Sequence, residues 1–180
     1  MNKKANEQFK SNEKRMMEIF MNLLEEKDIR KITVREICEK VQVNRSTFYN
    51  HFLDVYDMLD KMMILHTHAM ETLFSKGRSN VPRDNMRRIL SYMKEHKILY
   101  RASLHSPLKD KMLVGFERLY KSYDVEDYEN KDENERLTID YKLYFIEQGL
   151  FSLISYWLDH DCQMDIESFL DVIHEFYCLD

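Results

Sequence analysis

The chain has 180 residues, of which 44% are hydrophobic and 33% are charged, and its net charge is −5. It holds only three glycines and two prolines, too few for the turns that a β-sandwich, a barrel or an open α/β sheet requires. This composition predicts a folded all-α protein of one or two domains and excludes a collagen-like or disordered chain.

The sequence shows no sign of export or of membrane insertion. The uncharged stretch Gly149–Leu158 is much shorter than the roughly 18 residues that cross a bilayer. The basic residues that follow Met1 precede no apolar signal segment. Three cysteines without a paired spacing are typical of reduced thiols. We therefore expect a cytoplasmic protein with no membrane partner.

Charge is divided unevenly along the chain. Residues 1–52 carry 11 Lys/Arg against 8 Asp/Glu, whereas residues 53–180 have a net charge of −8. Phosphates would attract the basic N-terminal third and repel the acidic remainder. The asymmetry by itself is also compatible with chance.

Helix signals follow one another closely in the N-terminal third. They predict helices over residues 11–27, 33–40, 45–51 and 54–75. Thr33 and Glu36 have the spacing of a capping box at the start of the second helix. Asn44 is a good N-cap for the short third helix, and Asp54 for the fourth.

The rest of the chain also reads as helices, after a break at Lys76–Pro82. They are expected over residues 83–95, 97–104, 107–123, 136–158 and 166–177, with a solvated acidic loop over 124–135. The helix over 136–158 is apolar almost all round, so it must be buried on every side. A second subunit would cover one of those sides most simply.

The second and third predicted helices, joined by a corner at residues 41–43, form a candidate helix-turn-helix. In the third helix only Phe48 and Phe52 are apolar, and they would anchor it to the neighbouring helices. The other side chains offer hydrogen bonds to base edges and phosphates. We predict DNA contacts from Thr33, Arg35, Asn44, Arg45, Ser46, Thr47, Tyr49, Asn50, His51 and Tyr56.

Individual roles follow from side-chain chemistry. Arg45 would reach the O6 and N7 atoms of a guanine, and Thr47 would contact a base edge. Tyr49 and His51 would bond phosphates, while Arg35 would hold the other side of the groove. The alternative is an ordinary short exposed helix within a helical bundle.

The segment Ile32–Phe52, which ends in Val-Asn-Arg-Ser-Thr-Phe-Tyr-Asn-His-Phe, resembles the signature of the TetR family of transcriptional regulators. The resemblance extends from about Arg15 to Leu59. It implies an N-terminal DNA-binding domain, an all-helical C-terminal domain, dimerisation through the last two long helices and, in most members, repression released by a small ligand. The segment Gly149–Leu158 is similar to a subgroup that includes a regulator of dihydroxyacetone kinase operons.

Two positions depart from the family pattern. The family usually has glycine at the corner, where this chain has Gln42, and a positive φ there would bring a small strain. The family often has a phosphate-binding lysine at the start of the fourth helix, where this chain has Val55 and Tyr56. Lys61 and Tyr56 are expected to compensate in part.

Two further groups of residues are predicted in the C-terminal part and the linking helix. A ligand pocket would be lined by Met63, His66, Met70, Phe116, Tyr144 and Phe145, unless these simply fill the core. A dimer interface would include Leu153, Trp157, Phe169 and Ile173. A ligand would act by moving the helix over 54–75, the covalent link between the domains expected at residues 1–53 and 54–180.

Catalysis and metal binding are not expected. The sequence has no nucleophile, phosphate-loop or zincin pattern, and its paired histidines and cysteines lack further ligands. We therefore predict no cofactor and no enzyme activity; a small helical enzyme or carrier is the least favoured reading. The leading hypothesis is a homodimeric repressor that binds a palindromic operator in double-stranded DNA and is released by a small-molecule effector. The second is a coregulator whose C-terminal domain answers to a partner protein.

Overall fold

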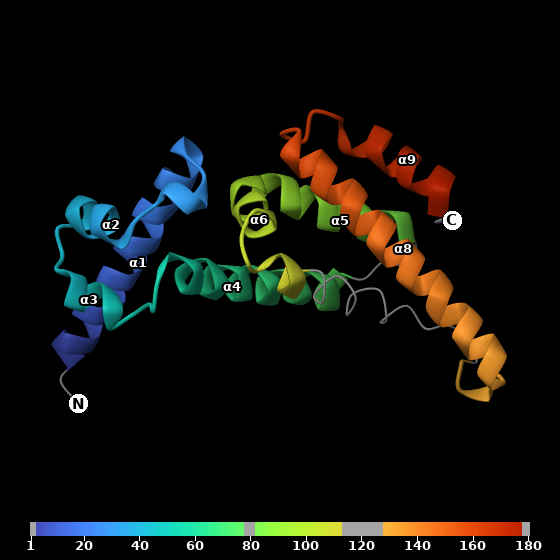
Figure 1. The fold of residues 1–180 in the computed structure, drawn as a ribbon, viewed down its shortest axis with the longest axis horizontal. Coiled ribbons are helices and arrows are strands. Elements are labelled where there is room, and N and C mark those ends of the chain that lie inside the picture. Colours follow the sequence, from blue (N-terminus) through green and yellow to red (C-terminus); the bar gives the residue numbers. More distant parts are fainter. Residues whose placement is uncertain (1–2, 78–81, 113–127, 178–180) are drawn as a thin grey trace. The chain divides into compact units, whose positions relative to one another are not determined.

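The computed structural model describes residues 3–77, 82–112 and 128–177, and all regular structure in these ranges is helical. The α-helices are α1 (Lys3–Glu26), α2 (Val34–Val41), α3 (Arg45–Tyr49), α4 (Val55–Gly77), α5 (Pro82–Glu95), α6 (Lys97–Leu104), α8 (Glu133–Asp159) and α9 (Ile166–Tyr177), with 3-10 turns at Ile29–Lys31 and Tyr128–Asn130 (Figure 1). None of the helices in the described ranges is long and apolar enough to cross a bilayer. The predicted all-α class is confirmed.

Two helices begin earlier than the sequence predicts. Helix α1 starts at Lys3 rather than at residue 11, although its first turns carry little apolar periodicity. Helix α8 starts at Glu133 rather than at residue 136, because Asp132 and Glu135 form a reciprocal capping box. The Asp132 carboxylate accepts from the Glu135 amide at 2.9 Å, and the Glu135 carboxylate accepts from the Asp132 amide at 3.1 Å. Two of the acidic residues predicted to lie in a loop therefore cap α8 instead.

The middle of the chain is only partly described. The predicted break at Lys76–Pro82 includes residues 78–81, which lie outside the described residues. Of the helix predicted over 107–123, residues 113–123 lie outside them too; Pro107 is in a turn and helical structure begins at Lys109.

The described helices pack into two compact units. The N-terminal unit comprises Met1–Glu71 and Ile98–Lys109, and the C-terminal unit comprises Thr72–Lys97 and Asp110–Asp180. The division into domains at residues 1–53 and 54–180 remains a prediction.

The core of the N-terminal unit is formed by side chains from α1, α2, α3, α4 and the later helix α6. Its buried members are Met16, Phe20, Leu23, Ile29, Ile32, Ile37, Cys38, Val41, Phe48, Phe52, Val55, Met58, Leu59, Met62, Leu99 and Ala102. Phe48 and Phe52, the two apolar residues predicted to anchor the third helix, are among them. Helix α6 supplies Leu99 and Ala102, so this core is completed by a segment that is distant in sequence.

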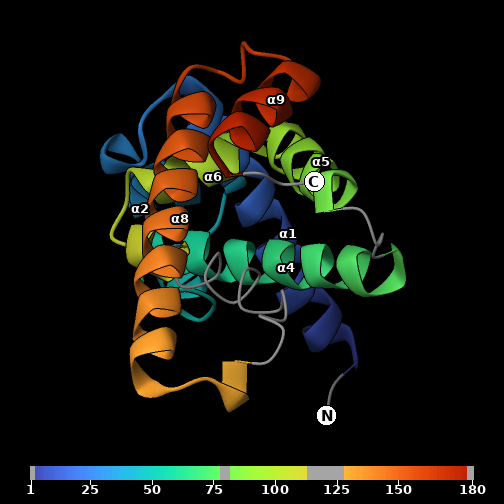
Figure 2. The ribbon, with the colours of Figure 1, turned by 90° about the vertical axis from the view of Figure 1, so that its right-hand side faces the viewer.

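The C-terminal unit is built around α8, α9 and α5. Trp157 of α8 stacks on Phe169 of α9, with ring centroids 4.9 Å apart and planes 10° apart. The Trp157 indole N–H donates to the Met164 carbonyl at 2.9 Å. Figure 2 shows α9 beside α5 and the C-terminal half of α8, while the N-terminal half of α8 extends beyond α9.

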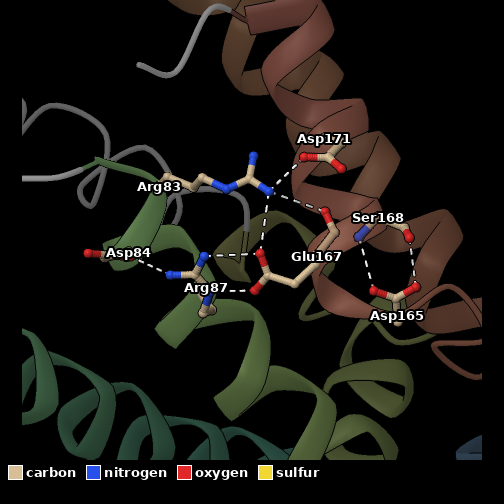
Figure 3. A network of polar contacts seen from close by, with 7 residues as sticks. All are labelled: Arg83, Asp84, Arg87, Asp165, Glu167, Ser168 and Asp171. Carbon is tan, nitrogen blue, oxygen red and sulfur yellow. Dashed lines mark hydrogen bonds and ion pairs between the residues drawn. The ribbon is translucent and has the colours of Figure 1, made fainter.

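A network of ion pairs joins α5 to α9 (Figure 3). The Arg87 guanidinium binds both carboxylate oxygens of Glu167, at 2.5 and 3.0 Å, and also pairs with Asp84. Arg83 reaches Asp171 at 2.6 Å and Glu167 at 3.4 Å. The hydrogen bond from Arg87 is the main cause that lowers the pKa of Glu167. The network therefore favours the ionised carboxylate in the folded state.

Loss of the Glu167 charge should weaken the C-terminal unit slightly. A carboxyl whose pKa is lowered by folding contributes stability above its unfolded pKa, and this is lost as the pH falls through the folded pKa. We expect Glu167→Gln to lower the melting temperature at pH 7 but not in acid, and high salt to shrink the difference, because the pair is exposed. The control is Glu175→Gln, an exposed position two turns further along α9. An equal effect of the two variants in calorimetry would contradict this prediction.

Candidate nucleic-acid interface

The corner between α2 and α3 is fixed by local hydrogen bonds. The Thr33 hydroxyl accepts from the Glu36 amide at 3.3 Å, as predicted for the start of α2. The Glu36 carboxylate does not complete the predicted box; it accepts instead from Lys27, the residue that directly follows α1, at 2.6 Å. Arg15 of α1 donates to the Val41 carbonyl at 2.7 Å. Arg15 of α1 and Lys27, directly after α1, thus hold the two ends of α2.

Helix α2 ends in a left-handed residue. Gln42 has φ 61° and ψ 46°, as the comparison with the family's glycine suggested. Its amide and that of Val43 donate back to carbonyls of the last turn of α2, which is the pattern of a Schellman motif. A residue with a Cβ in this conformation costs about 1 kcal/mol. The direction in which α3 leaves the corner is therefore set by the backbone.

Helix α3 is anchored at its start by Asn44. The Asn44 side-chain oxygen accepts from the Thr47 amide at 2.7 Å and from the hydroxyls of Ser46 and Thr47 at 2.6 and 2.8 Å. Phe48 and Phe52 are fully buried, with ring centroids 5.6 Å apart, as predicted. These contacts hold a helix of five residues that could not be stable alone.

Three predicted contact residues project from this anchored helix into solvent. Arg45 and Asn50 are exposed, and Tyr49 is 55% exposed. Within the described residues the Arg45 guanidinium has neither a hydrogen-bond nor an ion-pair partner. The Arg45 guanidinium and the Tyr49 hydroxyl are therefore both available on one short helix for contacts with bases and phosphates.

The other predicted contact residues also have structural roles. The side-chain Oδ1 of Asn44 accepts from the hydroxyls of Ser46 and Thr47, so those hydroxyls turn toward the cap. Arg35 is exposed but pairs with Glu39 at 2.6 Å. The Thr33 hydroxyl caps α2. The Tyr56 side chain is half-buried, and its amide donates to Asp54 at 2.8 Å, one of the bonds that cap α4.

The phosphate contact predicted for His51 is not supported by its position. His51 is only 6% exposed and its ring stacks on Phe9 of α1 at 3.7 Å. Burial is the main cause that lowers its pKa, so the neutral ring is favoured. His51 follows Phe48 by three residues and therefore shares the inward face of the helix.

Lys61 has a role that the sequence did not indicate. Its ammonium donates to the His51 carbonyl at 2.5 Å, pairs with Asp57 at 3.3 Å and lies 5.1 Å from the centre of the Phe52 ring. The predicted replacement of a phosphate-binding lysine by Lys61 is therefore not supported, because its donors are directed to the end of α3.

Cys38 lies under the corner. Its thiol is buried, and it donates weakly to the Asn44 carbonyl at 3.9 Å. Burial raises the pKa of this thiol, and nearby Arg45 opposes that shift only in part. A buried thiol with a raised pKa is unreactive, so Cys38 is a packing residue between α2 and α3.

The predicted pocket residues are divided between the two compact units. On α4, Met63 and His66 are half-buried, and buried Met70 accepts a hydrogen bond from the Tyr100 hydroxyl at 3.9 Å. Tyr144 and Phe145 of α8 are 64% and 74% exposed, so their assignment to an enclosed pocket is wrong. Phe116 lies outside the described residues.

The predicted dimer contacts are mostly core residues of a single chain. Trp157, Phe169 and Ile173 are at most 3% exposed, and they pack α8 and α9 together. Leu153 is half-buried. Trp157, Phe169 and Ile173 are therefore not free to meet a second subunit.

The opposite face of α8 is exposed and apolar. It presents Leu137, Tyr141, Tyr144, Phe145 and Tyr156, all more than half exposed. Their spacings of three, four and eleven residues place them on one side of the helix. Within the described residues the chain itself leaves this side of α8 uncovered, and the second subunit expected to cover one side of the helix stays a prediction.

The capped α2, the tight corner and the exposed α3 define a helix-turn-helix of the DNA-binding class. A family model described as bacterial regulatory proteins, tetR family, matches residues 21–61, and one described as transcriptional regulator C-terminal region matches residues 80–177. The chain belongs to the TetR family of transcriptional regulators.

Known proteins of this kind resemble the chain over most of its length. YxbF of Bacillus subtilis (strain 168), an HTH-type transcriptional regulator, is 25% identical over 175 residues, which make up 92% of this chain and 44% of YxbF. The chain thus spans less than half the length of that relative.

Solved structures share the fold at lower identity. A TetR transcriptional regulator from Streptococcus agalactiae 2603V has a TM-score of 0.68 and 21% identity, covering 96% of each chain. The dihydroxyacetone kinase operon activator DhaS has a TM-score of 0.60 and 16% identity, covering 92% of this chain and 93% of its own.

Proposed function

We propose that the protein is a homodimeric transcriptional regulator that inserts α3 into the major groove of a palindromic operator. The observation that carries this proposal is the exposed Arg45 on a short helix that Asn44 caps at its start and that contacts from α1 and α4 hold at its end. An arginine at the start of a recognition helix can bind the O6 and N7 atoms of guanine with two hydrogen bonds. Tyr49 lies one turn further on and is within the same exposed surface.

A dimer is supported by the exposed face of α8. Soluble monomers rarely leave a long row of aromatic side chains in water. In a symmetric dimer the same surface would meet itself, so Tyr141 and Phe145 of one protomer would pack against the partner's copy of this face. Two recognition helices related by such a twofold axis require a palindromic site, with half-sites one DNA turn, about 34 Å, or a multiple apart.

The sign and the trigger of regulation are proposed from the family. We propose repression that is released by a small molecule acting on α4, because α4 runs from the recognition segment into the C-terminal unit. The second candidate is control by a partner protein. Release of bound operator by metabolite extracts favours the first mechanism, and release by a co-purified protein favours the second.

Arg45→Ala should weaken operator binding by about 1–3 kcal/mol and relax specificity at one base pair of each half-site. The measurement is a binding titration with a duplex selected from a random library by the wild-type protein. Substitutions at each position of the duplex then report the specificity.

The matched control is Arg35→Ala, because Arg35 is exposed on α2 but already paired with Glu39. We expect it to weaken binding to all duplexes equally. If the wild type selects no duplex, or if Arg45→Ala binds the selected duplex as the wild type does, the proposed docking of α3 is wrong.

A further inference from the structure

Helix α1 extends beyond the part that packs into the N-terminal core. The first buried core residue in it is Met16, whereas Phe9 lies two turns earlier and is 43% exposed. The turns that precede Met16 therefore contribute little to that core. In Figure 1 the beginning of α1 lies beside α3.

One stacking contact ties this extension to the recognition segment. The Phe9 ring lies on the His51 imidazole, with centroids 3.7 Å apart and planes 30° apart. The buried Nδ1 atom of His51 has no hydrogen-bond partner among the described residues. The imidazole is therefore held through its ring faces rather than through that nitrogen.

The backbone of the same residue is held from the other side. Lys61 of α4 donates to the His51 carbonyl at 2.5 Å and lies over the ring of Phe52. Helix α3 has only five residues, so it has too little structure of its own to keep its direction. Its C-terminal end depends on α1 and α4.

We propose that Phe9 is a positioning residue for DNA binding, whose stacking on His51 holds the end of α3 in the orientation that presents Arg45 and Tyr49 to the groove. This inference rests on the proposed function. Without the ring of Phe9, the end of α3 would sample other orientations. The apparent affinity for DNA would then be reduced by a factor equal to the fraction of molecules in which α3 has the orientation that binds DNA.

The test compares Phe9→Ala, Phe9→Tyr and Gln8→Ala in binding titrations at several salt concentrations with the selected duplex. Phe9→Ala should bind about tenfold more weakly, the loss that corresponds to one aromatic contact. Phe9→Tyr keeps the ring and should bind as the wild type does. Gln8→Ala should also be unchanged, because the exposed Gln8 side chain donates to Asn12 of the same helix and not to the recognition segment, as far as the described residues go. Alanine favours helix, so unwinding of α1 would not explain a loss.

The salt dependence separates positioning from direct contact. Phe9 carries no charge, so Phe9→Ala should leave the slope of log affinity against log salt unchanged. A slope smaller by about one would mean that the substitution has removed a phosphate contact, and would overturn the inference. Equal affinities of Phe9→Ala and wild type would overturn it too.

A measurement without DNA completes the test. Burial lowers the pKa of His51, with Glu13 opposing and Lys61 adding to that shift. In an NMR titration Phe9→Ala should bring the His51 pKa closer to the ordinary value, and Phe9→Tyr should not. An unchanged His51 pKa in Phe9→Ala would show that the stack does not hold the ring and would overturn the inference. If the wild type itself selects no duplex, the proposed function fails and the inference with it.

Discussion

Phe145→Asp should prevent formation of the proposed dimer and leave a monomer of 22.0 kDa. Phe145 is 74% exposed near the middle of the apolar face of α8, so in a symmetric interface each dimer would bury two new carboxylates. A buried charge without a partner costs several kcal/mol, and each 1.4 kcal/mol is a factor of ten in the dissociation constant. Light scattering over a range of concentrations measures the mass.

The design includes two controls on the same helix. Lys142→Asp changes the charge at an exposed position that is already polar, and it should leave the dimer intact. Trp157→Asp places the same carboxylate in the core between α8 and α9, and it should unfold the C-terminal unit rather than release folded monomers. A wild type that remains monomeric at all concentrations would rule out the proposed interface.

Phe48→Ala should destabilise the N-terminal unit by about 3–5 kcal/mol, the usual cost of removing a buried aromatic ring. Phe48 is 0% exposed and contacts Phe52 and Tyr49, so the cavity would lie directly beneath the recognition helix. Because a domain of this size is stable by only 5–15 kcal/mol, DNA binding should fail well below the temperature at which α8 and α9 unfold. Hydrogen exchange resolved by segment measures this difference.

The neighbouring substitution separates folding from contact. Tyr49→Ala removes a ring that is 55% exposed, so it should lower DNA affinity and leave exchange in α1 and α2 almost unchanged. If Phe48→Ala exchanges like the wild type throughout α1 and α2, the anchoring role given to Phe48 is wrong.

Local signals predict the N-terminal helices well. Thr33, Asn44 and Asp54 cap α2, α3 and α4 as their sequence positions suggest, because a cap involves only the next few residues. The same holds for the inward positions of Phe48 and Phe52, which a four-residue spacing determines. The start of α1 is different, since its early turns are held by a contact between Phe9 and His51, 42 positions apart.

The wrong site assignments have a common physical cause. Polarity identifies a side chain that can bind a phosphate, but it does not tell whether another helix covers it, as Phe9 covers His51. In α8 both faces are apolar, so hydrophobicity alone does not tell which face α9 covers. Trp157 is on the covered face and Phe145 is on the other. The spacing of His51 from Phe48 was a usable signal for burial.

The ion pairs between α5 and α9 also set an order of events during synthesis. The N-terminal unit ends at Lys109 in sequence, so its core can close while the rest of the chain is still being made. Helix α5 is translated before that point, but its partners Glu167 and Asp171 are made only about 60 residues after it. At about 5–20 residues per second, the interval lasts on the order of several seconds. During it α5 lacks its partner α9, against which it packs in the folded chain, and we expect nascent chains to need protection by chaperones at that stage.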